Sequence, residues 1–258
     1  MSGFPSPLLT DFERFQRHPD DVIEGALLVS RLVEPATDTA WCRRELLNLA
    51  NAVGPAASAH RVLEVFRGEG FRGAEAYYEA RNSALQSVLT TRRGIPISLA
   101  VCLLGVARLL DIPAQGINFP GHFMITVERQ LIDPFQLAVL DAETRASRLA
   151  AAGVPAGVAL RPASPRDIVL RMLNNLRGLA ESRQDAASAL EITDYQCVLA
   201  PRDFGLRMLR ADLWQALGVG GMARREWELA RDLAPDPATR AGVEARLSSV
   251  ENTPRSLH

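Results

Sequence analysis

The sequence predicts a mostly helical α+β protein with a small antiparallel sheet, and three observations support this. Over much of the first 110 residues, apolar residues recur at the three- and four-residue spacing of helices. Residues 116–135 instead form short extended runs around a tight-turn signal. From Asp167 onward only the helical spacing returns. We therefore expect one small sheet packed on a central helix, followed by an all-α region.

The N-terminal part is predicted to form a layer of helices. Residues 20–35 and 38–53 carry apolar residues at helical spacing, and proline or glycine punctuates the two stretches. Residues 56–70 give a third helix, because Gly68 and Gly70 suit a helix end and turn.

A central helix is predicted to begin at Pro96, since proline is tolerated at the first position of a helix. It runs to about Leu110, and apolar residues occupy almost every position between. Such a pattern leaves almost no polar face, so we expect the helix to be buried. Asn82 and Ser83 precede the segment LQSVL and are expected to cap a short helix there.

The segment GINFPGHFMITVERQLIDPF predicts a β-hairpin that turns near Glu128 and Arg129. A two-residue turn gives antiparallel partners an odd index sum, which places His122 and Asp133 on the same face of the sheet. We expect a hydrogen bond between these two side chains. Asp133 precedes Pro134, so an Asx-turn that ends the strand is also expected.

The C-terminal part is predicted to consist of two tandem helical hairpins and a capping helix at 238–250. Residues 146–167 are rich in Ala, Gly and Pro, which indicates a covering loop and a linker. An LRML quartet begins at Leu170 and again at Leu206, close to the roughly 34-residue period of tetratricopeptide repeats. We expect two domains: residues 1–165, with the helical layer and the sheet, and residues 166–258, with the repeats.

Composition excludes several classes of function. The formal charge of −1 argues against a nucleic-acid binder held by phosphate contacts, and no apolar run approaches a membrane span. The chain has no lysine, which removes Schiff-base and P-loop chemistry. The cysteines, three in number, lack CxxC pairing, so disulfide and zinc frameworks are not expected. We expect a cytoplasmic protein with no cofactor, no nucleic-acid partner and no membrane partner.

The central motifs FRGAEAYYEARNSALQSVLTTRRGIPISLA, GINFPGHFMI, LIDPF and RMLNNL resemble those of the transglutaminase-like proteins of the bacterial SirB kind. The resemblance is strong over residues 71–176 and looser elsewhere. It implies a papain-like core flanked by a helical N-terminal part and by tetratricopeptide-like repeats.

In that superfamily, the resemblance implies a Cys at the start of a central helix, a His on one strand and an Asp on the next. His122 and Asp133 match the His and the Asp, but Pro96 occupies the position of the Cys and cannot attack a carbonyl. Cys102 lies about 9 Å further along the helix and on another side of it. Ser98, in the first helical turn, is the alternative nucleophile.

Two functions follow as hypotheses. The first is a non-catalytic interaction or regulatory protein that keeps a transglutaminase-like core and binds a protein or peptide through its C-terminal repeats. The alternative is a hydrolase or acyltransferase that uses His122 and Asp133 with Ser98 or water. Metal binding by His122 and Asp133 would lack a third ligand in the sequence.

Overall fold

The computed structural model describes residues 6–155 and 160–251, and the chain divides into two compact units, Met1–Met172 and Leu173–His258. The division falls inside helix α8 (Pro165–Ser182), just after its first two turns. The sequence predicts the domain boundary at the start of this helix. α8 is thus continuous across the boundary between the two units.

Helices make up the N-terminal layer of the first unit: α1 (Pro7–Arg17), α2 (Val22–Val33), α3 (Thr39–Val53) and α4 (Ala59–Gly68). Aspartate or serine caps the last three, because each side-chain oxygen accepts a backbone N–H of the first turn. The last three are the helices that the sequence predicts. It misses α1, whose two buried side chains, Phe12 and Phe15, lie one turn apart.

Helix α6 (Pro96–Leu109) is the centre of the first unit. It begins at Pro96 as predicted, and the side chains from Ile97 to Ala107 are buried. The short helix α5 (Leu85–Thr91) contacts it together with α2 and α3. This burial on all sides explains why the helix carries no polar face.

The larger of the two sheets in the described part of the chain contains five strands, in the order β6-β5-β4-β3-β7, and every neighbouring pair in it is antiparallel. The smaller sheet pairs β1 (Arg72–Gly73) with β2 (Arg93–Gly94) in parallel. The strands of the larger sheet are β3 (Ala114–Phe119), β4 (His122–Val127), β5 (Gln130–Asp133), β6 (Ala138–Val139) and β7 (Arg161–Ala163). Glu128 and Arg129 form the predicted two-residue turn with φ values of 50° and 75°, the backbone of a tight hairpin.

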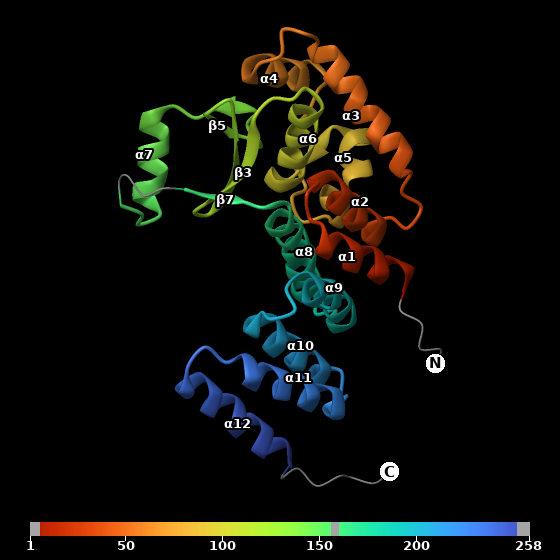
Figure 1. Ribbon diagram of the computed structural model, residues 1–258, viewed down its shortest axis with the longest axis vertical. Helices are drawn as coiled ribbons and strands as arrows, with labels where there is room; N and C mark the ends of the chain where they lie inside the picture. Colours follow the sequence, from red (N-terminus) through yellow and green to blue (C-terminus); the bar gives the residue numbers. More distant parts are fainter. Residues whose placement is uncertain (1–5, 156–159, 252–258) are drawn as a thin grey trace. The chain divides into compact units, whose positions relative to one another are not determined.

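The two faces of the sheet are covered by different helices, and Figure 1 shows α6 on one side and α7 (Ala142–Ala151) on the other. Side chains alternate between the faces along each strand. Ile117, Met124 and Leu131 pack with Leu149 of α7. The intervening residues of β4 are also buried and lie on the α6 side, where α6 contacts the strand.

The tip of the hairpin is tied to the helical layer. The Glu128 carboxylate accepts a hydrogen bond from the backbone N–H of Ala59, the first residue of α4, at 2.8 Å. At the other end of α4, the Arg67 guanidinium donates to the Leu137 carbonyl from two nitrogens, at 2.6 and 3.1 Å. Both ends of α4 are thus held by the sheet region.

Residues 146–167 differ from the prediction of a loop and linker. The structure forms α7 there and, further along, the edge strand β7; residues 156–159 lie outside the described part. Asp141 caps α7 by accepting the Thr144 N–H at 2.6 Å. β7 tolerates Pro162 because it pairs on one side only.

The second unit is all-α, as predicted: after the end of α8 come α9 (Ala186–Leu199), α10 (Phe204–Ala216), α11 (Gly220–Leu233) and α12 (Pro237–Glu251). Trp227 is 2% exposed and packs with Ala211, Ala223 and Val243. In the described residues, no helix has the length and apolar character needed to cross a bilayer.

Candidate functional site

Ser98 is sealed inside the first turn of α6. Its Oγ accepts a hydrogen bond from the Ile95 N–H and donates one to the Ile95 carbonyl, both at 3.1 Å. The residue is 1% exposed, and a Cβ added at Gly94 would lie 2.7 Å from this Oγ. The hydroxyl therefore acts as a cap for the helix start, with its donor and its acceptor both used locally.

His122 is the first residue of β4 and is exposed. Gly121 before it has a φ of +71°, a backbone conformation that glycine adopts at no steric cost, so the chain reverses sharply here. His122 pairs with Phe119 across β3, and strand alternation places its side chain on the face of Met124. This is the face that α7 covers.

Asp133 is buried, 6% exposed, and both oxygens of its carboxylate accept hydrogen bonds. One oxygen accepts the backbone N–H groups of Phe135 and Gln136 at 2.9 and 3.2 Å, which is the predicted Asx-turn. The other accepts a hydrogen bond from the Arg148 guanidinium of α7 at 2.9 Å. The expected hydrogen bond from His122 is not among these contacts, so that expectation was wrong. The charged partner of Asp133 is Arg148 instead.

The three predicted site residues do not converge on one point. In the pairing of β4 with β5, the residue numbers of each pair of partners add up to an odd number. His122 and Asp133 therefore share a face, as predicted. That face is turned toward α7, whereas Ser98 belongs to α6 on the opposite side of the sheet. The sequence predicts the shared face correctly, but it cannot tell which helix covers it.

The three thiols are buried and stay protonated at neutral pH. Burial raises the pKa of Cys102 to about 12, and it raises the pKa of Cys42 and of Cys197 to about 11. A nucleophilic cysteine needs the opposite shift. Cys102 is thus the buried core residue that its position in the helix predicts.

Metal ligands are not grouped in the described residues, where no three His, Cys, Asp or Glu side chains could share an ion. A cavity of about 420 Å³ lies at the far end of α6, lined by Leu104, Arg108 and Ile112 among others. Ser98, in the first turn of the helix, is not among the residues that line it.

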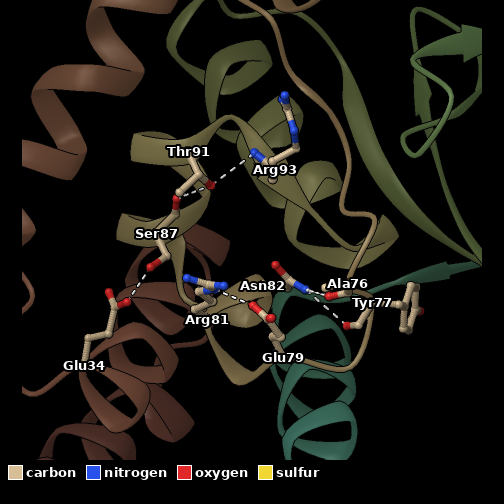
Figure 2. Close-up of polar contacts among 9 residues, drawn as sticks. All are labelled: Glu34, Ala76, Tyr77, Glu79, Arg81, Asn82, Ser87, Thr91 and Arg93. Atoms are coloured by element: carbon tan, nitrogen blue, oxygen red, sulfur yellow. Dashed lines mark hydrogen bonds and ion pairs between the residues drawn. The ribbon is translucent and has the colours of Figure 1, made fainter.

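An ordered loop precedes α5 and carries exposed aromatic side chains. The Asn82 amide donates to the carbonyls of Ala76 and Tyr77 at 2.6 and 3.2 Å, so Asn82 holds this loop instead of capping α5 as expected. Figure 2 shows the Tyr77 ring pointing away from Asn82. Tyr77 and Tyr78 are 42% and 79% exposed, and their rings meet edge to face.

Sequence reasoning missed a further residue beside this loop. Arg171 of α8 places its guanidinium carbon 5.4 Å from the centre of the Phe123 ring, and its charge acts on the Tyr77 phenol. Phe123 lies on the α6 side of the sheet, because it alternates with Met124. Only tertiary structure brings these three residues together, so no local pattern could have indicated the cluster.

The chain is similar to one protein-family model and to several known proteins. A family model for the transglutaminase-like superfamily matches residues 31–174. The UPF0162 protein of Pseudomonas aeruginosa is 30% identical over 258 residues, covering 94% of this chain and 96% of that protein. The UPF0162 protein of Vibrio cholerae is 28% identical over 238 residues, covering 84% and 88%.

Human F-box only protein 21 is 29% identical over 157 residues, which are 55% of this chain but 25% of that longer protein. No solved structure matches the chain. The superfamily model spans more than half of the chain, and the Pseudomonas relative aligns with nearly all of it. The chain therefore belongs to the UPF0162 family and carries a core of the transglutaminase-like superfamily.

Proposed function

We propose that this protein is a non-catalytic binding protein built on a transglutaminase-like core. The observation that carries the proposal is that Ser98 and the His122–Asp133 pair lie on opposite sides of the sheet. Acyl transfer by a triad needs the nucleophile and the base within hydrogen-bond reach of each other. Pro96 at the cysteine position and the Asp133–Arg148 ion pair support the same conclusion.

The partner in this proposal is a protein or peptide bound by the C-terminal helices, which we interpret as tetratricopeptide-like hairpins of the SirB kind. Stacked helical hairpins commonly offer a surface for peptides and partner helices. Three apolar residues of this region are exposed at its α10–α11 hairpin, namely Leu217, Val219 and Leu229. Solvent-exposed side chains of this type are available for contact with such a partner.

The test measures turnover directly. The purified full-length protein is incubated with a glutamine-containing acceptor protein and a primary amine, and separately with ester and amide substrates, and products are read by mass spectrometry. We expect no turnover by wild type, none by Pro96→Cys, and no effect of His122→Ala on the melting temperature. The Pro96→Cys variant matters because it restores the missing thiol while leaving His122 across the sheet.

A papain-like protease serves as the positive control in the same assays. Turnover by wild-type protein that disappears in a fully folded His122→Ala variant would refute the non-catalytic proposal and favour the hydrolase or acyltransferase. Binding is followed on a peptide array with full-length wild type and a Leu217→Asp/Val219→Asp variant. Equal binding of both proteins would remove the α10–α11 hairpin from the proposal.

A further inference from the structure

Arg171 is a positive charge that the fold has partly taken out of water. Its side chain projects from α8, is partly buried and lies over the Phe123 ring. Burial lowers the pKa of its guanidinium, and the other influence on it is the Tyr77 phenol. A charge removed from water costs free energy unless an opposite charge or hydrogen bonds replace the water.

No such replacement comes from the described part of the protein. Arg171 makes neither a hydrogen bond nor an ion pair there, and no carboxylate acts on it. The other partly buried arginines described in the first unit each make a hydrogen bond or an ion pair. Arg93 and Arg166 donate to backbone carbonyls, Arg31 pairs with Asp11 at 2.7 Å, and Arg148 with Asp133 at 2.9 Å. Arg92 likewise pairs with Glu45 at 3.5 Å.

The loop that carries Tyr77 is held in place, and the Tyr77 phenol can donate a further hydrogen bond. Asn82 fixes the loop through the Ala76 and Tyr77 carbonyls. Burial raises the pKa of the Tyr77 phenol, which is therefore a protonated donor at neutral pH. Tyr78, which is 79% exposed, extends the aromatic surface toward solvent.

We propose that Arg171, whose guanidinium lies over the buried ring of Phe123, binds a single carboxylate group of a peptide ligand, with the partly exposed Tyr77 phenol as a further donor. A guanidinium stacked on a ring keeps its N–H edges free, and these edges match a carboxylate in a two-pronged hydrogen bond. Among the described residues, Arg171 is the arginine that lies over Phe123, and it brings a single positive charge to the site. One positive charge suits a carboxylate better than the double charge of a phosphate.

This site rests on the proposed binding function and names the chemistry of one ligand group. The test titrates the full-length protein with N-acetylphenylalanine, with the neutral N-acetylphenylalaninamide and with inorganic phosphate, followed by NMR of the guanidinium N–H groups and by calorimetry. We expect saturable binding of the acid, at least about tenfold weaker binding of the amide, and phosphate weaker than the acid.

Variants assign the binding to the site. Arg171→Gln should weaken binding of the acid at least about tenfold, and Tyr77→Phe a few-fold. Arg145→Gln, which removes an exposed arginine of α7 that makes no ion pair with the described residues, is the matched control and should bind like wild type. Arg171→Lys keeps the charge but cannot form the two-pronged hydrogen bond, so it should bind with intermediate affinity. This variant distinguishes the loss of a ligand contact from the loss of the folded structure.

Three outcomes would overturn the site: equal binding of acid and amide, wild-type affinity in Arg171→Gln, or binding of phosphate alone. Mass spectrometry of the amide after the titration separates this failure from failure of the proposed function. Conversion of the amide to the acid would refute the non-catalytic proposal and leave the carboxylate site standing. If the amide stayed intact and the acid did not bind, the carboxylate site would be refuted and the non-catalytic proposal would stand.

Discussion

Two partly buried arginines lie against opposite faces of the same sheet, and they are treated differently. Arg148 of α7 is bonded to Asp133, whose side chain is only 9% exposed, and its charge is compensated inside the protein. Arg171 of α8 lies over Phe123 on the other face and has no compensating group in the described residues. The difference indicates that Arg148 serves the fold, whereas Arg171 is available to a ligand.

The two faces of the sheet also differ in what they offer for function. The face of Arg148 contains His122 and Asp133, the residues that resemble catalytic ones, yet there the carboxylate is used to hold α7 and the turn after β5. On the face of Arg171, Pro96 stands in the position of the superfamily Cys, and the alternative nucleophile Ser98 is sealed in the first turn of α6. A charge without a partner is therefore a better guide to a binding site here than the catalytic motif.

The largest expected effect is a difference in the free energy of unfolding between variants of the two arginines. Arg148→Met should lower the free energy of unfolding by about 3 kcal/mol, because it leaves the Asp133 carboxylate buried without its partner. Arg171→Met keeps an apolar side chain of similar length and removes a charge that has no opposite charge among the described residues, so it should change stability by no more than about 0.5 kcal/mol. Urea unfolding of the two variants measures both values.

A double variant checks the interpretation of that experiment. Asp133→Asn should keep the acceptor for the Phe135 and Gln136 N–H groups while removing the negative charge. Combined with Arg148→Met, it should recover about half of the lost stability. If Arg148→Met and Arg171→Met proved equally destabilising, the two charges would have equal structural roles and the comparison would fail.

The next effect tests whether water reaches the buried side chains of α6, the helix that covers the same face of the sheet as Arg171. The Cys102 thiol has a pKa of about 12 in the folded protein, against 9.0 as its ordinary value. Between these values the unfolded chain loses a proton that the folded protein keeps, so stability falls as pH rises above 9.0.

This thiol should contribute a slope of about 1.4 kcal/mol per pH unit, which Cys102→Ala would remove. The measurement is urea unfolding at pH values from 8 to 10.5 for both proteins. A thiol reagent should label no cysteine of the folded protein at pH 8. Rapid labelling of Cys102 would mean that water enters the core around α6 and would contradict the raised pKa of this thiol.

The smallest effect concerns Ser98. Ser98→Ala should cost about 1 kcal/mol, because the Ile95 N–H at the start of α6 loses its acceptor. Ser98→Thr retains the hydroxyl and controls for its loss, although its extra methyl group must fit beside Gly94. Unchanged stability of Ser98→Ala would contradict the capping role and return the hydroxyl to the candidates for chemistry.

Much of the fold could be predicted from the sequence because its main determinants are local. Pro96 fixes the start of the central helix, and its apolar run predicts the burial. The turn at Glu128 and Arg129 fixes the register of the hairpin and thereby the shared face of His122 and Asp133. Helix α7 was missed because its alanine-rich sequence has weak apolar periodicity and a single buried residue, Leu149.

The candidate site could not be predicted in the same way. The partner of Asp133 is Arg148, and only the packing of α7 on the sheet decides this. Asn82 has the sequence context of a helix cap, but the nearby carbonyls of Ala76 and Tyr77 offer it better acceptors. That Arg171 has no charged partner among the described residues depends on tertiary packing, which no spacing of residues encodes.

The hydrogen bond between the hairpin tip and α4 has a consequence for the order of folding. Glu128 and Ala59 are separated by 69 positions, and Arg67 and Leu137 by 70. During synthesis, α4 can complete neither of these hydrogen bonds until the whole hairpin has left the ribosome. Contacts at such separations slow folding, because a long loop must close before they form. We expect amide protection in α4 and in the hairpin to arise together, as one cooperative step.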